Sequence, residues 1–256
     1  MSVHLDEYLA FALQVALDAG RVALEHYQTG VAVEFKADAS PVTRADRGAE
    51  QVIRQAIAKR YPDHAVVGEE YGADGRASAF RWIVDPIDGT KSFIRGVPLF
   101  GVLIALEIDG HAEVGVCHMP ALGETVAAAT GLGCTWNGQS ARASKVDHLR
   151  DATVVFSDGR MLARRLGHRW GQLESEAGLL RSWGDCYGHC LVATGRADVM
   201  LDPVMNAWDC AALLPIVREA GGRFSDWDGV ARIDGGDAVS TNEALHTRVL
   251  ELLQGA

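Results

Sequence analysis

The stretch WIVDPIDGTKSF, residues 82–93, begins as an apolar strand and ends in a turn. Two acids, Asp85 and Asp88, stand where the apolar run ends, with Pro86 between them and Gly89 after them. Two carboxylates at the end of a buried strand repel each other and lose hydration unless a cation lies between them. Because Pro86 and Gly89 bend the chain, both acids can point to one side, and the stretch indicates a cation site.

Two further acids fall at the boundaries of predicted elements. Glu69 lies at the end of the short strand AVVGEE (65–70), and Asp209 lies at the start of the helix expected over residues 208–220. Carboxylate oxygens are hard ligands that suit Mg²⁺ or Mn²⁺, and the bend after Asp85 can aim the Ile87 carbonyl inward as another oxygen ligand. Taken singly, each acid also fits a turn, a helix start or a solvated loop.

The composition is that of an ordinary soluble globular protein. The chain has 256 residues, of which 48% are hydrophobic and 23% charged. Its formal net charge of -10 argues against partners such as nucleic acid or an anionic membrane, which attract basic proteins. The beginning, MSVHLDEYLAFALQ, has early acids and no basic segment, and no apolar run approaches a membrane span. We therefore expect no signal peptide and a cytoplasmic location.

The cysteines are odd in number and scattered, so we expect reduced, mostly buried thiols rather than a disulfide framework. They are Cys117, Cys134, Cys186, Cys190 and Cys210. The segment DCYGHC (185–190) brings Cys186, His189 and Cys190 together, which would suit a soft metal. A closed zinc site needs four ligands, and no second CxxC or HxxxH accompanies this segment. The alternative is a buried helix face.

The order of expected elements is mixed. Helical periodicity predicts helices over residues 5–27, 43–60, 187–194, 208–220 and 244–253. The middle is strand-rich, with a hairpin turning at Asp109-Gly110 and a further turn at Asn137-Gly138. This pattern predicts a layered α+β architecture rather than a doubly wound sheet. We expect one domain over 1–256, with an N-terminal part to about 145 and a C-terminal part from about 146.

Three segments resemble the signatures of the inositol monophosphatase family, whose members are metal-dependent, lithium-sensitive phosphatases. They are GEE (68–70), WIVDPIDGT (82–90) and WDCAALLPIVREAGG (208–222). The resemblance covers nearly the whole chain, from KADASPVTRAD (36–46) to AVSTNEALH (238–246). It implies a layered αβαβα sandwich, usually a homodimer, that acts on a small phosphate monoester with two or three Mg²⁺ ions, or Mn²⁺ in their place.

The resemblance also implies roles for individual residues. The metal ligands would be Glu69, Asp85, the Ile87 carbonyl, Asp88 and Asp209, with Glu69 also serving catalysis. Residues expected to contact substrate are Asp88, Gly89, Thr90, Asp185, Asp202 and Asp209. Gly89 and Thr90 would offer backbone N–H groups to the phosphate at a helix start. Thr90 and Asp46 would orient and deprotonate the attacking water, although Thr43-x-x-Asp46 also reads as a capping box.

A mechanism follows from the charge of a phosphate monoester, which repels hydroxide. Divalent ions held by the acids would bind the phosphate oxygens, acidify a water and stabilise the leaving alkoxide. No Cys or Ser lies in a convincing nucleophile motif.

The substrate branch is indicated by TKSFIRGVPLFGVLIALE (90–107) and GDCYGHCLVATGRAD (184–198), which look like the histidinol-phosphate phosphatases of histidine biosynthesis. Such a substrate carries an ammonium and an imidazole, so its pocket should hold acids that bind no metal. Asp185 and Asp202 match substrate-contacting positions, although the family more often has a longer Glu at the latter. Asp185 also fits a helix N-cap, and Asp202 a turn acid.

Other functions stay open at this point. An inositol phosphate or a 3′-phosphoadenosine nucleotide is the alternative substrate, and a non-enzymatic metal-binding interaction protein is the remote alternative.

Overall fold

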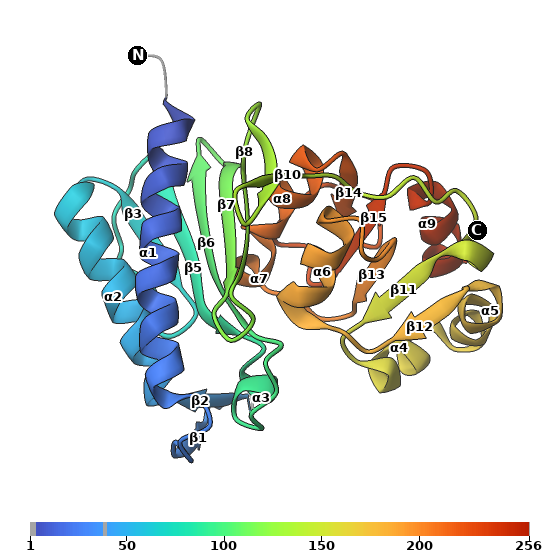
Figure 1. Ribbon diagram of the computed structural model, residues 1–256, viewed down its shortest axis with the longest axis horizontal. Helices are drawn as coiled ribbons and strands as arrows, with labels where there is room; N and C mark the ends of the chain where they lie inside the picture. The colour runs from blue at the N-terminus through green and yellow to red at the C-terminus, as the bar shows by residue number, and fades with distance from the viewer. Residues whose placement is uncertain (1–3, 38–39, 256) are drawn as a thin grey trace.

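The computed structural model describes residues 4–37 and 40–255 of the chain. Residues 1–3, part of the sequence considered for a signal peptide, and residues 38–39, part of the segment 36–46, lie outside it. Helices and sheets alternate in five layers across the molecule (Figure 1). A pair of N-terminal helices, a large sheet, a middle layer of helices, a smaller sheet and an outer group of helices follow one another. This order confirms the expected αβαβα sandwich.

The large sheet has eight strands in the order β10-β9-β8-β7-β6-β5-β3-β4. Its neighbours are antiparallel except β3 and β5, which run parallel and end at the same edge. The predicted hairpin at Asp109-Gly110 is confirmed and joins β6 to β7. The strands are β3 (Ala65–Gly68), β4 (Gly72–Ala73), β5 (Phe80–Asp88), β6 (Gly101–Ile108), β7 (His111–Met119), β8 (Glu124–Ala129), β9 (Gly133–Trp136) and β10 (Gln139–Ala141).

Helices α1 (Leu5–His26) and α2 (Arg44–Arg60) cover one face of this sheet. The buried face of α1 carries small residues, including Ala12, Ala16 and Ala19, so the helix can approach the strands closely. On α2, Ile53 and Ile57 are fully buried, and each stabilises the fold by roughly 1.5–3 kcal/mol on an area basis. The predicted N-cap Thr43 is confirmed, since its hydroxyl accepts a hydrogen bond from the Ala45 N–H.

The middle layer contains α6 (Asp185–Ala193), α7 (Ala207–Cys210) and α8 (Leu213–Glu219), packed against the other face of the large sheet. The single helix expected over 208–220 is therefore wrong, because it divides into two. Proline has no N–H, and its ring collides with the carbonyl four residues earlier in a continuous helix. For Pro215 that carbonyl belongs to Ala211, in the break between α7 and α8.

The smaller sheet has five strands in the order β12-β11-β13-β15-β14. Its strands are β11 (Thr153–Phe156), β12 (Leu179–Arg181), β13 (Val199–Asp202), β14 (Gly222–Ser225) and β15 (Ala238–Asn242). The outer layer consists of α4 (Gly159–Leu166), α5 (His168–Glu176) and α9 (His246–Gln254). Sequence analysis predicted α9 but not α4, α5 or β12. Leu162, Leu166, Trp170 and Leu173, which recur at helical spacing, form the buried side of α4 and α5.

Two further strands, a short helix and a 3₁₀ turn lie outside these layers. Strands β1 (Val33–Phe35) and β2 (Pro41–Thr43) form an antiparallel pair that leads into α2. The four-residue helix α3 (Thr90–Phe93) follows β5, and the 3₁₀ turn η1 (Leu149–Asp151) precedes β11. Among the described residues, no helix has the length and apolar character required to cross a bilayer.

Candidate active site

Three carboxylates meet where the large sheet and the middle helical layer join. Asp85 and Asp88 lie at the end of β5, and Asp209 lies in α7. One oxygen from each lies within 4.8 Å of the others. Among the described residues this is the one group of three or more acidic, histidine or cysteine side chains arranged to hold a metal ion. We call Asp85, Asp88 and Asp209 the acid cluster.

The backbone of β5 explains how two acids three residues apart reach the same point. Its pairing with β6 is regular up to Asp85 and is interrupted before Asp88, which shifts the register. The Ile87 N–H donates to Asp85 Oδ1 at 3.0 Å and fixes that carboxylate at the bend. Gly89 then takes a left-handed conformation with φ 84°, and a Cβ there would lie 2.8 Å from the Leu99 carbonyl oxygen. Only glycine fits this turn without strain.

The acid cluster is electrostatically unfavourable without a cation. Burial raises the pKa of Asp85 well above its usual value, and the charges of Glu69, Asp88 and Asp209 raise it further. Burial also raises the pKa of Asp88, with added repulsion from Asp185 and Asp209. The pKa of Asp209 rises to about 6, again chiefly through burial. A bound divalent cation would remove this penalty, so the all-oxygen donor set fits a hard metal ion.

Glu69 lies beside the acid cluster but is not one of the three acids whose oxygens approach within 4.8 Å of one another. It follows β3, and its N–H donates to the Val84 carbonyl at 3.2 Å, which sets it next to the end of β5. Lys36 Nζ donates to Glu69 Oε1 and to Glu70 Oε1, both at 2.7 Å. Burial alone would lower the Lys36 pKa, but these two hydrogen bonds raise it overall. Glu69 is thus held by a lysine while its charge still acts on Asp85.

Thr90 and Asp46 come together across 44 positions of sequence. Thr90 Oγ1 lies 3.4 Å from Asp46 Oδ1 and 3.0 Å from the Ile87 carbonyl oxygen. The other Asp46 oxygen, Oδ2, accepts from the Thr43 N–H and the Thr43 hydroxyl, both at 2.7 Å. The capping box predicted at Thr43 is therefore confirmed, and it leaves one oxygen of Asp46 facing Thr90.

A cavity of about 370 Å³ opens beside the acid cluster. Five acids line it: Asp88, Asp158, Asp185, Asp202 and Asp209. Asp185 has a left-handed backbone with φ 56°, an uncommon conformation for a non-glycine residue. Its side chain caps no helix, so the N-cap explanation of this residue is wrong. Burial raises the Asp185 pKa, and Lys91 partly offsets that rise.

Asp202, the last residue of β13, is 5% exposed. The Ser157 hydroxyl donates to its Oδ1 at 2.8 Å, and the Val204 N–H makes a longer contact of 3.5 Å, so the carboxylate also serves the turn predicted before Pro203. Burial raises the Asp202 pKa to about 8. The cavity therefore contains the buried Asp202 and the partly buried Asp185, besides the more exposed Asp158, and none of these three belongs to the acid cluster.

Comparison with known proteins agrees with this arrangement. The sequence profile of the inositol monophosphatase family matches residues 4–256. The chain belongs to this family. The extragenic suppressor protein suhB from Bartonella henselae has the same fold, with a TM-score of 0.91, 30% sequence identity, and coverage of 97% of this chain and 98% of that one.

Relatives within the inositol monophosphatase family include proteins named histidinol-phosphatase. One from Chlorobaculum parvum is 47% identical over 240 residues, covering 93% of each chain. One from Mycobacterium tuberculosis is 43% identical over 227 residues, covering 86% of this chain and 87% of the relative. Membership places the chain among phosphatases and disfavours the non-enzymatic alternative.

The segment DCYGHC forms a buried face of α6. Cys186, His189 and Cys190 are buried in α6, and no metal-binding group among the described residues contains them. His189 Nδ1 pairs with the Ser240 hydroxyl at 2.7 Å, and burial lowers the His189 pKa to about 3. The alternative of a buried helix face is correct. The backbone of Cys186 serves the site directly, because its N–H donates to Asp88 Oδ2 at 2.5 Å.

Sequence analysis missed three residues that shape the site. Lys36 holds Glu69 and Glu70, Ser157 holds Asp202, and Glu50 accepts from the Glu70 N–H at 2.8 Å. Glu50 had a detectable signal, because an acid at position 50 lies on the stripe of α2 that also buries Ile53 and Ile57. Lys36 and Ser157 lie in irregular segments, where side-chain spacing carries no such signal.

Proposed function

We propose that this protein is a Mg²⁺-dependent histidinol-phosphate phosphatase of histidine biosynthesis, which hydrolyses L-histidinol phosphate to L-histidinol and phosphate. The observation that carries the proposal is the pair Asp185 and Asp202, which line the same cavity as Asp88 and Asp209. A substrate with a phosphate at one end and an ammonium and imidazole at the other matches two groups of acids in one cavity. The names of the relatives at 47% and 43% identity support the same substrate.

We propose that the acid cluster, Glu69 and the Ile87 carbonyl hold two or three Mg²⁺ ions, with Mn²⁺ as a substitute. Such ions supply positive charge for the phosphate oxygens and the leaving oxygen and make a nearby water more acidic. Lys36 donates to Glu69, so a metal ion bound at Glu69 would compete with this lysine. Gly89 and the start of α3 would face one side of the phosphate.

Thr90 and Asp46 are proposed to prepare the attacking water. A hydroxyl has one proton, so Thr90 donates either to Asp46 Oδ1 or to the Ile87 carbonyl. When it donates to Asp46, its lone pairs can accept a hydrogen bond from water, which orients an oxygen lone pair of the water toward phosphorus; the water proton would pass to Thr90 as the Thr90 proton passes to Asp46. Burial raises the pKa of Asp46, so this carboxylate is better able to receive that proton.

The far end of the substrate would meet Asp185 and Asp202. Both have raised pKa values caused first by burial, and a cation placed between them would favour their charged forms. An inositol ring offers only hydroxyls, which gain less from a buried carboxylate than an ammonium does. The geometry therefore favours a cationic substrate over inositol phosphates.

A substrate panel tests the proposal. We would measure kcat/KM for L-histidinol phosphate, myo-inositol 1-phosphate, 3′-phosphoadenosine 5′-phosphate and p-nitrophenyl phosphate, each with Mg²⁺ and with EDTA. We expect histidinol phosphate to be preferred and all activity to need the metal. A higher kcat/KM for the inositol or nucleotide substrate would contradict the proposed specificity. The proposal includes a cytoplasmic homodimer, which size-exclusion chromatography with light scattering would check for its oligomeric state.

A further inference from the structure

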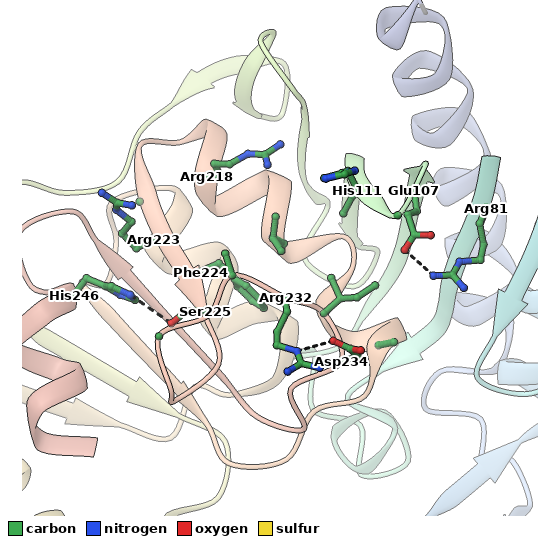
Figure 2. A pocket seen from close by; sticks show the side chains of 18 residues that line it. Arg81, Glu107, His111, Arg218, Arg223, Phe224, Ser225, Arg232, Asp234 and His246 are labelled. Atoms are coloured by element: carbon green, nitrogen blue, oxygen red, sulfur yellow. Dashed lines mark hydrogen bonds and ion pairs between the residues drawn. The ribbon is translucent and has the colours of Figure 1, made fainter. Parts of the chain in front are cut away.

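A second cavity, of about 670 Å³, lies away from the acid cluster (Figure 2). Its lining comes from the start of β5, the turn between β6 and β7, helix α8, and the segment between β14 and β15. None of Asp85, Asp88 and Asp209 lines it. Its volume falls in the range of about 300–1,000 Å³ that is typical of small-molecule sites. We call it the arginine cavity.

The arginine cavity gathers several guanidinium groups in a protein whose formal net charge is -10. The lining includes four arginines against one glutamate and one aspartate. The arginines are Arg81, Arg218, Arg223 and Arg232. Arg223 also donates twice to Glu243 at 2.6 Å, and Arg218 Nε lies 4.0 Å from Glu219 Oε1, so both also face acids outside the lining. Because each guanidinium has more N–H groups than its one carboxylate partner can accept, this concentration of arginines offers hydrogen-bond donors to an anion.

The arginines keep free hydrogen-bond donors. Each guanidinium has five N–H groups, and the described contacts use few of them. Arg81 gives its Nη2 to Glu107 Oε2 at 2.7 Å, while its buried Nε finds no acceptor among the described residues. Arg232 gives its Nε to Asp234 Oδ1 at 2.7 Å, and Arg218 gives its Nη2 to the Thr130 hydroxyl at 2.6 Å. A buried donor without an acceptor is costly, so an acceptor supplied by a ligand would stabilise the site.

Figure 2 shows Arg81 beside Glu107 and Arg232 beside Asp234, on different parts of the fold, with the guanidinium groups of Arg218 and Arg223 apart from both. The lining also includes apolar side chains, among them Leu214, Phe224 and Ile233. Phe224 is 5% exposed and Leu214 is 9% exposed, so both present a firm wall rather than a mobile surface. An occupant would place its acidic oxygens against the guanidinium groups and its carbon body against this wall.

We propose that the arginine cavity binds a small organic anion, one that carries a carboxylate, sulfonate or phosphate group on an apolar or aromatic body. The site is independent of the proposed phosphatase reaction and needs no metal ion. Its position still ties it to the acid cluster. Ala207, which lines the cavity, begins α7, the helix that carries Asp209, and Arg81 lies in β5, the strand that carries Asp85.

The test uses 8-anilinonaphthalene-1-sulfonate as the anionic probe and N-phenyl-1-naphthylamine, the same ring system without the sulfonate, as the neutral probe. Binding is followed by probe fluorescence in EDTA, a condition in which the acid cluster repels anions. We expect one equivalent of the sulfonate to bind the wild-type protein more tightly than the neutral probe. Failure of the proposed histidinol-phosphate activity would leave this result unaffected, since no turnover is measured.

Variants locate the binding. Arg232→Gln and Arg218→Gln should each weaken sulfonate binding about tenfold or more, as expected for loss of a hydrogen bond to a charged group, and leave the neutral probe unchanged. The matched control is Arg164→Gln, which removes the same charge from an exposed position on α4. Far-UV circular dichroism and the melting temperature establish that each variant is folded. Because Arg232 and Arg218 lie on different elements, one variant still tests the proposal if the other fails to fold. Equal sulfonate affinities in all three variants, or equal affinity of wild type for both probes, would overturn the proposal.

Discussion

Asp46 contacts Thr90 with one carboxylate oxygen and closes the N-terminus of α2 with the other. The two oxygens thus serve different purposes, one structural and one directed at the site. Because Oδ2 is fixed by two bonds to Thr43, the position of Oδ1 relative to Thr90 is fixed as well. A carboxylate that is 0% exposed and held in this way loses little freedom when it acts on a substrate.

Thr90→Val removes the hydroxyl while keeping the shape of the side chain. We expect kcat to fall roughly 10²- to 10⁴-fold, the range typical of general acid–base catalysis, with little change in melting temperature. The matched control is Thr153→Val on β11, where a partly buried threonine lies outside the site. A Thr90→Val enzyme with kcat within about threefold of wild type would show that the hydroxyl plays no part in the reaction.

Asp88→Asn removes one charge from the acid cluster. We expect kcat/KM to fall at least about 100-fold, which is about 2.7 kcal/mol of barrier, together with weaker Mg²⁺ binding by calorimetry. In EDTA the variant should melt at a higher temperature than wild type, because repulsion and burial raise the Asp88 pKa and the ionised group destabilises the fold.

Asp147→Asn, a charge removal at an exposed position, is the control for Asp88→Asn and should change neither quantity. Activity of Asp88→Asn within about threefold of wild type at saturating Mg²⁺ would remove the basis for assigning this residue to the metal.

Chelation tests the need for metal without mutation. We expect EDTA to abolish phosphate release and added Mg²⁺ to restore it, because carboxylate oxygens exchange such ions with solvent. Lithium at millimolar-order concentration should inhibit, as the family resemblance implies. Full activity in excess chelator would show that the reaction needs no exchangeable metal.

Asp185→Asn should discriminate between substrates. Asn adopts a left-handed backbone as readily as Asp, so the substitution removes the charge without disturbing φ. We expect kcat/KM for histidinol phosphate to fall about ten- to a hundredfold and that for p-nitrophenyl phosphate to change little.

Asp158→Asn is the matched control for Asp185→Asn. Asp158 lines the same cavity, but its carboxylate accepts from the Met161 N–H at the start of α4, and Asn caps a helix equally well. Equal losses on the two substrates in Asp185→Asn would defeat the view that Asp185 recognises the cationic end.

Asp202→Asn tests whether burial raises the pKa of the Asp202 carboxyl, through the effect of pH on the stability of the protein. The Asp202 pKa is about 8 in the folded protein against 3.8 for the ordinary group, so the folded state binds more protons between these values. Its ionisation therefore lowers stability as pH rises from about 4 to 8. In EDTA the variant should match wild type near pH 4 and melt several degrees higher at pH 8, since about 1 kcal/mol corresponds to roughly 2–4 °C in a protein of this size. A melting difference that stays constant with pH would contradict the raised pKa.

Much of the fold was predictable because its signals are local. The turn at Asp109-Gly110 and the N-cap Thr43 depend on a few neighbouring residues, and both are confirmed. The break between α7 and α8 was missed, although Pro215 marks it, because the apolar spacing continues through it. Helices α4 and α5 were missed for a different reason. They are short, and charged residues separate their few apolar positions.

The site was predictable in part for a similar reason. Asp85, Asp88 and Asp209 were expected together, and the structure brings them within reach of one ion. The hydrogen bond from Lys36 to Glu69 and the left-handed backbone of Asp185 depend on tertiary contacts, which spacing in the sequence does not reveal. The arginine cavity is of this kind too, since its arginines are spread over more than 150 positions of sequence.

The acid cluster draws on two layers, and this has a consequence for synthesis on the ribosome. Asp88 emerges about 120 residues before Asp209, so no metal ion can bind the complete cluster while the large sheet is forming. The sheet face that α8 later covers includes the apolar residues Leu103, Cys117 and Val126, which remain open to water throughout that interval. The nascent chain is therefore most prone to aggregate through this face. Slow translation between residues 141 and 213 would lengthen the time in which such aggregation can occur.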